Sequence, residues 1–369
     1  MVTTLLFLGF LFLCWHYLEY FLGKISWNIF GGWDARYFWN LKAKFLFRDP
    51  ALWRGMFSPI LDWAHPDYPL FLPGSIAWGW NLLGEEFLIW PAVVDLVFFI
   101  SLLLLLLWYA GSFHSWTTAW IAGSFLLSIP NYAFWSTTQY ADIPLAFLFT
   151  AAALFASLGL RRNSPSLFWV AGLFAGLSAW MKNEGLFFIG WLGFLIVLHR
   201  LIHRDVAWKH KLSTLFQYGL GTLLGLAAVL YAKCCLGLAG GEYLGSGRGF
   251  QDYWQAIFSS SEKTKFIALC FWVFKISFSQ WSLLWILFLM SPILWGHRLF
   301  QDSRWFFPLL VLLIEFGYFV ILHVAPSEIS FQIRISLHRL LLHTGVLALI
   351  SIVELAGPLV LPSFRKTRD

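Results

Sequence analysis

Residues 87–108 read FLIWPAVVDLVFFISLLLLLLW, and Asp95 is the one charged side chain among them. A helix rises about 1.5 Å per residue, so an apolar run of this length spans the roughly 30 Å hydrocarbon core of a bilayer. The segment therefore predicts a membrane-spanning helix. Because a charged group is costly in lipid, we expect Asp95 to face protein.

The composition of the chain extends this prediction to the whole protein. Of 369 residues, 59% are hydrophobic and 12% are charged, and the mean hydropathy is +0.71. Charged residues at about half their usual frequency cannot coat a water-soluble body of this size, and the same composition excludes a disordered chain. The chain has 25 basic and 19 acidic residues. This basic excess does not indicate binding to nucleic acid, because basic residues beside membrane helices first indicate which helix ends face the cytoplasm.

Similar apolar runs recur along the chain and predict about ten transmembrane helices. They cover residues 4–22, 87–108, 116–135, 143–160, 167–181, 186–202, 212–232, 280–295, 305–322 and 340–361. We expect an all-α polytopic membrane protein that forms a single transmembrane domain over residues 1–369. Residues 23–86 and 233–279 form its two long outer loops, and an even number of spans places both termini on one side.

The first outer loop contains two further helical patterns. Residues 33–47 (WDARYFWNLKAKFLF) place apolar and polar side chains at helical spacing, which predicts an interfacial amphipathic helix. Residues 69–83 (PLFLPGSIAWGWNLL) are apolar but short, and Pro73 and Gly74 interrupt them. We expect a second juxtamembrane helix here, because a crossing would reverse the side of every later loop.

The short connections sort by charge into two faces. One face collects basic residues, namely Arg161, Arg162, Arg200, Arg204, Lys209, Lys211, Arg298, Arg304, Arg365, Lys366 and Arg368. By the positive-inside rule this face and both termini are cytoplasmic. Most acids gather on the opposite, outer face, which predicts that the chemistry of the protein faces the periplasm or the exterior, as in a bacterial inner or plasma membrane.

Four polar clusters reach that outer face. They are residues 31–37 with Asp34, 65–69 with His65 and Asp67, 140–144 with Asp142, and 182–185 with Lys182 and Glu184. Each has a structural alternative: Asp34 and Asp142 could begin helices, residues 65–69 could form a rigid turn, and Lys182 could simply pair with Glu184. Buried charges of this kind are costly unless they pair or bind a charged ligand.

Further ionisable residues lie near or within the apolar runs. Arg334, His338 and Arg339 precede the last run and could contact lipid headgroups or clamp a phosphate. Asp95, Glu315 and Glu354 lie nearest the centres of apolar runs, where they could serve proton-coupled transport or satisfy backbone groups. The glycine-rich residues 237–249 lack a phosphate-binding signature and suggest a flexible outer loop, a candidate lid.

The order of these motifs resembles the GT-C glycosyltransferases, in particular the bacterial family 39-like enzymes that include protein O-mannosyltransferases and lipid A aminoarabinose transferases. The resemblance covers about the first 200 residues. It rests on GGWDARYFW (31–39), HPDYPL (65–70), DIPL (142–145) with Arg161 and Arg162 closing the same helix, and GLSAWMKNEG (176–185). Asp34 is followed by Ala35 where some members have an acidic pair, which leaves a divalent metal as an open question.

The resemblance implies transfer of a sugar from a polyprenyl-phosphate donor to a lipid, glycan or protein hydroxyl, with inversion. It implies that Asp34 is the general base, with Tyr37 beside it in the site. Arg339, Lys182 and Arg36 would bind the phosphate with Arg334 and His338 nearby, and His65, Asp67, Asp142 and Glu184 would bind the sugar or acceptor. The alternatives are a lipid-linked sugar flippase or another transporter, and an inactive scaffold subunit.

Overall fold

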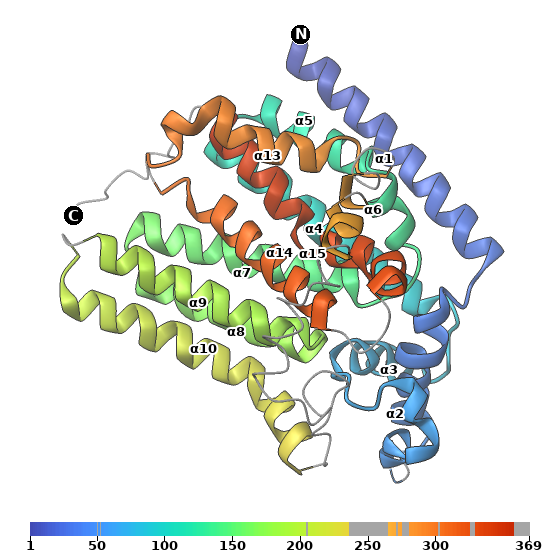
Figure 1. Ribbon diagram of the computed structural model, residues 1–369. Helices are drawn as coiled ribbons and strands as arrows, with labels where there is room; N and C mark the ends of the chain where they lie inside the picture. The colour runs from blue at the N-terminus through green and yellow to red at the C-terminus, as the bar shows by residue number, and fades with distance from the viewer. Residues whose placement is uncertain are drawn as a thin grey trace, which may run out of the picture.

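The computed structural model describes residues 1–49, 51, 53–203, 206–235, 265–270, 272–274, 280–301, 303–324 and 329–357 (Figure 1). Every regular element in this part of the chain is a helix. The predicted all-α fold is therefore confirmed for the described residues. The glycine-rich residues 237–249, most of the second outer loop and the basic C-terminal residues lie outside them.

Six of the described helices are long and apolar enough to cross a membrane. They are α1 (Val2–Trp27), α4 (Trp90–Phe113), α7 (Asp142–Arg162), α9 (Glu184–Ile202), α10 (Trp208–Cys235) and α15 (Ile329–Ala356). These helices are the ones expected of a multi-pass membrane protein.

The other predicted spans are also helical but are not among the six candidates. They correspond to α5 (Trp116–Leu127) with α6 (Pro130–Trp135), α8 (Pro165–Met181), α13 (Leu284–Trp295) and α14 (Phe306–Val324). The apolar stretch of α14, Phe306–Leu322, has fewer than 18 residues. The described residues thus contain six candidate spans, and the predicted count of about ten is not confirmed.

The prediction of one continuous helix over residues 116–135 is wrong. The chain leaves helical geometry at Ile129, where φ is −82° and ψ is 112°, and Pro130 begins α6. Proline has no backbone N–H to donate and disfavours helical geometry in the residue before it, so the helix ends here. The break turns the chain toward residues 136–141, which lead into α7.

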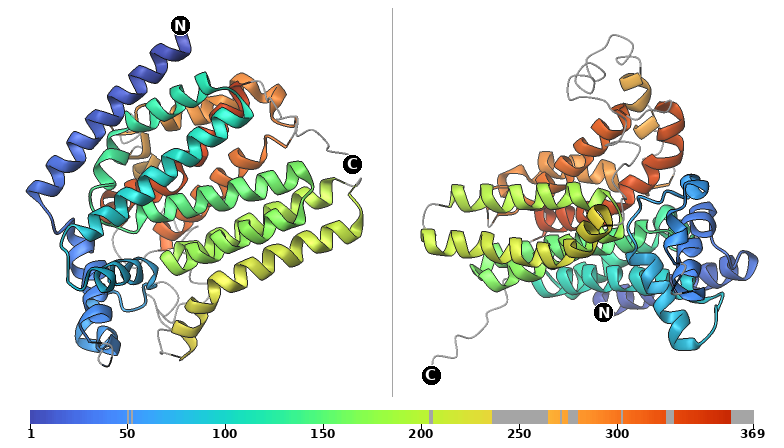
Figure 2. Two further views of the ribbon diagram at one scale, coloured as in Figure 1. Left: turned by 180° about the vertical axis from the view of Figure 1, so that it is seen from behind. Right: turned by 90° about the horizontal axis from the view of Figure 1, so that it is seen from below.

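Both helices predicted in the first outer loop are present. Residues 33–47 form a π-helical turn, η1 (Ala35–Trp39), followed by α2 (Asn40–Arg48), and residues 69–83 form α3 (Phe71–Leu83). Two short 3₁₀ helices, η2 (Trp53–Phe57) and η3 (Pro59–Ala64), connect them. Helix α3 packs on α2 and α8, and Figures 1 and 2 show α2 and α3 beyond one end of the bundle.

Helix α7 lies at the centre of the bundle. It is almost wholly buried and packs against α4, α8, α9 and α15. Helix α8 packs closely against α10 as well as against α7. The backbones are so close that a Cβ added at Gly172 would come within 2.1 Å of the Tyr218 carbonyl oxygen. Small residues permit this contact between membrane helices.

The basic connections meet at one end of α7 and α15. There Arg161 Nη2 lies 2.8 Å from Glu354 Oε2, Arg304 donates to the Glu354 carbonyl at 2.6 Å, and Arg298 donates to the Ala356 carbonyl at 2.8 Å. Asp142 and Arg339 lie together at the opposite ends of the same two helices. Charged residues thus gather toward both ends of these two helices, and the predicted sorting of basic and acidic faces across the membrane stays a prediction.

Candidate functional site

Five charged side chains from four segments of the chain meet at the end of the bundle beside the first outer loop. Asp34 precedes η1, Asp142 is the first residue of α7, Lys182 and Glu184 flank the turn between α8 and α9, and Arg339 lies on α15. We call these five residues the charge cluster. Four of the five come from the motifs on which the family resemblance rests.

Asp142 lies at the centre of the charge cluster. Its carboxylate Oδ1 lies 2.9 Å from Lys182 Nζ, and Oδ2 lies 2.8 Å from Arg339 Nε. The residue is fully buried. Two cationic partners offset the cost of burying this carboxylate, which makes none of its described hydrogen bonds to the backbone of α7. Interaction with other segments, and not helix capping, therefore explains Asp142.

Asp34 belongs to the same network through Arg339. Arg339 Nη1 lies 2.7 Å from Asp34 Oδ2, and the backbone N–H of Asp34 donates to the Tyr140 hydroxyl at 3.1 Å. The Asp34 side chain makes no capping hydrogen bond to the helix that follows. The alternative that Asp34 is simply a helix cap is therefore wrong, and its Oδ1 has no hydrogen-bond partner among the described residues.

An aromatic residue holds the guanidinium of Arg339 between the two carboxylates. Its Cζ lies 4.8 Å from the centroid of the Tyr140 ring, at cation–π distance. Burial raises the pKa of Tyr140, and the nearby Asp34 carboxylate raises it further. The hydroxyl of Tyr140 thus stays protonated. It accepts a hydrogen bond from the backbone N–H of Asp34, while the Tyr140 ring contacts the guanidinium of Arg339.

Lys182 pairs with two acids at once. Its Nζ lies 2.7 Å from Glu184 Oε1 in addition to its contact with Asp142. Burial alone would lower the pKa of Lys182, but the two carboxylates outweigh burial and raise it above its usual value. The pairing that the sequence offered as the structural alternative is present, and it keeps the amine charged inside the protein.

His65 and Asp67 lie in a turn next to the charge cluster. Asp67 Oδ2 accepts a hydrogen bond from the side chain of Asn183, which lies between Lys182 and Glu184, at 3.1 Å. Lys42, on α2 and 1% exposed, donates from Nζ to the backbone carbonyls of His65 at 2.5 Å and Tyr68 at 3.2 Å. Burial lowers the pKa of Lys42 to about 7, an effect that Asp67 partly offsets.

His343 was missed by sequence reasoning although it completes the network. Its Nε2 lies 2.9 Å from Asp142 Oδ1, and its Nδ1 lies 2.9 Å from the Tyr318 hydroxyl. An ionised carboxylate can only accept, so Nε2 carries a proton and, in the neutral ring, Nδ1 accepts from Tyr318. The spacing of four residues between Arg339 and His343 places both on one helical face and could have indicated this role.

Besides His65 and Asp67, four other residues of the predicted site lie outside the charge cluster. Arg36 donates to the Asn28 side chain at 2.7 Å, and the Tyr37 ring packs 4.1 Å from that of Trp33. Arg334 is exposed, and its guanidinium lies over the ring of Phe331. His338 Nδ1 lies 3.2 Å from the side-chain nitrogen of Asn131. The structure thus places these four side chains in contact with other residues.

The three acids within apolar runs all face protein, as predicted. Asp95 accepts a hydrogen bond from the backbone N–H of Gln139, Glu315 accepts one from Thr344, and Glu354 pairs with Arg161. No three His, Cys, Asp or Glu side chains in the described part of the chain are grouped as metal ligands.

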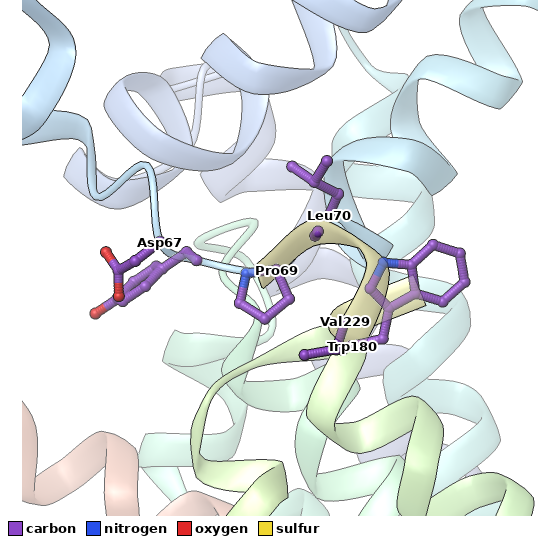
Figure 3. Close-up of a pocket in the computed structure, with 7 residues that line it drawn as sticks. Asp67, Pro69, Leu70, Trp180 and Val229 are labelled. Carbon is purple, nitrogen blue, oxygen red and sulfur yellow. The ribbon is translucent and has the colours of Figure 1, made fainter. Parts of the chain in front are cut away.

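An apolar groove of about 510 Å³ lies between α3, α4 and α8. Its lining residues are Phe71, Gly74, Ser75, Trp78, Trp90, Val93, Val94, Val97, Phe98 and Trp180. Trp180 also lines a small pocket with Asp67, Tyr68, Pro69 and Leu70, which Figure 3 shows in close-up. Trp180 thus separates the groove from the small pocket, and Asp67 in that pocket accepts the hydrogen bond from Asn183.

Comparison of the chain with family models, with curated proteins and with solved structures found no match. The resemblance to the GT-C glycosyltransferases therefore stays a prediction from the motifs quoted above.

Proposed function

We propose that this protein is a membrane glycosyltransferase that moves a sugar from a polyprenyl phosphate to an acceptor hydroxyl, with inversion at the anomeric carbon. One observation carries the proposal: Asp34, Asp142, Lys182 and Glu184, which come from three separate motifs of the sequence, belong to one ion-pair network with Arg339. A carboxylate beside fixed cations supplies both groups that such a transfer needs, a proton acceptor and a charge stabiliser.

In this proposal the free oxygen of Asp34 accepts the proton of the acceptor hydroxyl. The acceptor oxygen then forms a bond to the anomeric carbon as the bond from that carbon to the phosphate oxygen breaks. The polyprenyl phosphate leaves with the bonding electrons. A single displacement of this kind inverts the configuration, and the carboxylate must lie on the side opposite the phosphate.

Arg339 and Lys182 are the groups proposed to stabilise the charge on the leaving phosphate. Arg339 uses Nε and Nη1 in its ion pairs, which leaves Nη2 without a partner among the described residues. Lys182 Nζ has three N–H donors and uses two of them. Charge-assisted hydrogen bonds from the remaining donors suit a phosphate, and the existing ion pairs hold both cations in place before the donor arrives.

The apolar groove fits the proposed donor, because a polyprenyl chain is a long hydrocarbon attached to a charged head. Aromatic and aliphatic side chains line the groove, and Trp180 lines both the groove and the small pocket that contains Asp67. A donor could therefore keep its chain in the apolar groove while its head lies on the side of Asp67, which accepts a hydrogen bond from Asn183 beside Lys182.

The polar groups of the described chain support an enzyme over a transporter. The charged residues of α7 lie at its two ends, at Asp142 and at Arg161, and the buried residues between them are apolar apart from small residues such as Thr150 and Ser157. A transported polar headgroup would need partners along the path across the membrane.

A transfer assay tests the proposal. Purified protein is incubated with a panel of radiolabelled polyprenyl-phosphate sugars and with cell-envelope acceptor fractions, and the products are separated by thin-layer chromatography. The proposal predicts release of polyprenyl phosphate together with a labelled acceptor for at least one donor. Movement of an intact donor across vesicle membranes without cleavage would contradict it and indicate a flippase.

A further inference from the structure

A buried acid outside the charge cluster contacts the loop from which Tyr140 extends. Asp95, on α4, is 1% exposed, and its Oδ2 accepts a hydrogen bond from the backbone N–H of Gln139 at 2.9 Å. Gln139 has a φ of +60°, in the left-handed region, which is sterically unfavourable for a residue other than glycine. The Asp95 carboxylate therefore stabilises an unfavourable backbone conformation.

Gln139 in turn connects this loop to the segment that contains Asp34. Its side-chain Nε2 donates to the Ile29 carbonyl at 2.9 Å, and its Oε1 accepts from the Asn40 side chain at 3.0 Å. Ile29 precedes Asp34 and Asn40 begins α2, so the Gln139 side chain holds the chain on both sides of Asp34.

Backbone groups of residues 31–34 complete the contact. The N–H of Gly32 donates to the Thr138 carbonyl at 3.0 Å, and that of Asp34 donates to the Tyr140 hydroxyl. A Cβ added at Gly32 would lie 2.6 Å from the Tyr140 hydroxyl oxygen. The backbone of residues 31–34 is therefore in direct contact with residues 138–140, so a shift of one segment would displace the other.

Stability alone does not explain a buried polar side chain at position 95. Oδ1 of Asp95 has no hydrogen-bond partner among the described residues, so half of a buried carboxylate is unsatisfied. Burying such a group is costly. Unfavourable features of this kind gather where the structure fixes a functional group.

We propose that Asp95 is a positioning residue for Asp34. By holding Gln139 in its left-handed conformation, it fixes residues 31–34 against residues 138–140 and sets the distance from Asp34 to Arg339. The proposed effect of Asp95 on the position of Asp34 does not depend on any reaction. The effect of Asp95 on turnover rests on the proposed glycosyltransferase function.

Hydrogen exchange tests the placement directly. In Asp95→Ala, peptides covering residues 29–38 should exchange at least about tenfold faster than in the wild type, because the amides of Gly32 and Asp34 lose their fixed partners. Asp95→Asn should retain wild-type exchange, because its side-chain oxygen can accept from Gln139. Glu354→Ala is the matched control, and should speed exchange near Arg161 but not at residues 29–38.

A second variant covers the case in which Asp95→Ala does not fold. Gln139→Gly keeps the left-handed backbone without strain but removes the bonds to Ile29 and Asn40. It should speed exchange at residues 29–38 in the same way. Wild-type exchange there in Gln139→Gly, or equal acceleration throughout the protein in the folded Asp95→Ala variant, would overturn the proposal.

Turnover provides the second readout once a donor is known. Asp95→Ala should lower kcat by about 100-fold, as expected for a misplaced catalytic group, and leave the KM for the donor within about threefold. Asp95→Asn should restore kcat. Absence of transfer by the wild type would contradict the proposed function and leave the exchange result as the test of positioning, so the two failures are distinguishable.

Discussion

Arg339 contacts Asp142, 197 residues earlier in the chain, through Nε at 2.8 Å. The Nη1 atom of the same guanidinium lies 2.7 Å from Asp34. One planar side chain therefore joins the first outer loop, the start of α7 and α15. This bridge explains how residues so far apart in the sequence form one site.

The bridge predicts that lysine cannot replace Arg339. The guanidinium reaches Asp142 through Nε and Asp34 through Nη1, two nitrogens held apart in one plane, whereas a lysine at this position would present a single nitrogen. We expect both Arg339→Lys and Arg339→Ala to weaken donor use by about 5- to 150-fold, equivalent to about 1–3 kcal/mol. The measurement is kcat/KM for the donor.

Arg334→Ala is the control for this prediction, because Arg334 is an exposed arginine on the same helix. It should stay within about twofold of the wild type. Full activity in Arg339→Lys would show that the bridge has no functional role, and an equal loss in Arg334→Ala would indicate a general effect of charge.

The groove predicts a dependence on the length of the lipid chain. Gly74 lines the groove, and a Cβ added there would meet no atom within 4 Å, so Gly74→Leu should fill the groove without strain. We expect at least a tenfold rise in KM for a long-chain polyprenyl donor and little change for a short, soluble analogue.

Gly190 provides the matched control for Gly74→Leu. It lies in α9, outside the groove, and a Cβ there would also meet no atom within 4 Å. Gly190→Leu should leave both KM values unchanged. If Gly74→Leu affected long and short donors alike, the groove would not hold the lipid chain.

Lys42 predicts a rise in stability with pH. Burial lowers its pKa from 10.5 to about 7 in the folded protein, so between these values the unfolded chain binds more protons than the folded one. Stability therefore rises as the pH increases from about 7 toward 10, and the full difference corresponds to on the order of 4 kcal/mol. Below pH 7 the cost of the buried charge is fully present.

Thermal unfolding in detergent at pH 6.5 and pH 9 measures this effect. The Tm of the wild type should increase between these pH values by several degrees more than that of Lys42→Met, which has no amine to titrate. The difference between the two proteins isolates Lys42 from other groups that titrate in this range. Equal changes in both would show that Lys42 keeps an ordinary pKa.

The predicted orientation can be tested with single cysteines in a cysteine-free background. Trp33 is 62% exposed beside Asp34, and Arg162 is exposed at the other end of α7. An impermeant maleimide added to sealed cells should label Trp33→Cys and not Arg162→Cys. Labelling of both from outside would reject the topology, and labelling of Arg162→Cys alone would invert it.

Helix positions were largely predictable from the sequence, because apolar runs mark them directly. The prediction of one helix over residues 116–135 was wrong, because Pro130 interrupts the helix although the whole run is apolar. The number of spans was less predictable, since α5 and α13 are apolar but short. Length of the helix, and not hydropathy alone, separates a candidate span from a shorter buried helix.

The site was predictable only in part. The order of the motifs pointed to Asp34, Asp142, Lys182 and Glu184, which all belong to the charge cluster. Residues near them in the sequence, such as Arg36, do not belong to it. A helix turns about 100° per residue, so Arg36 points away from the side that Asp34 occupies and contacts Asn28. The tertiary contacts that bring His343 to Asp142 could not be derived from one sequence without its packing.

Turnover of Asp34→Asn tests the central claim most directly. Asparagine is nearly the same size and can still accept from Arg339, but it cannot act as a general base. We expect a folded protein that binds the polyprenyl-phosphate donor and transfers sugar about 100- to 10,000-fold more slowly than the wild type. Transfer at close to the wild-type rate would contradict the assignment of Asp34 as the base and, with it, the proposed mechanism.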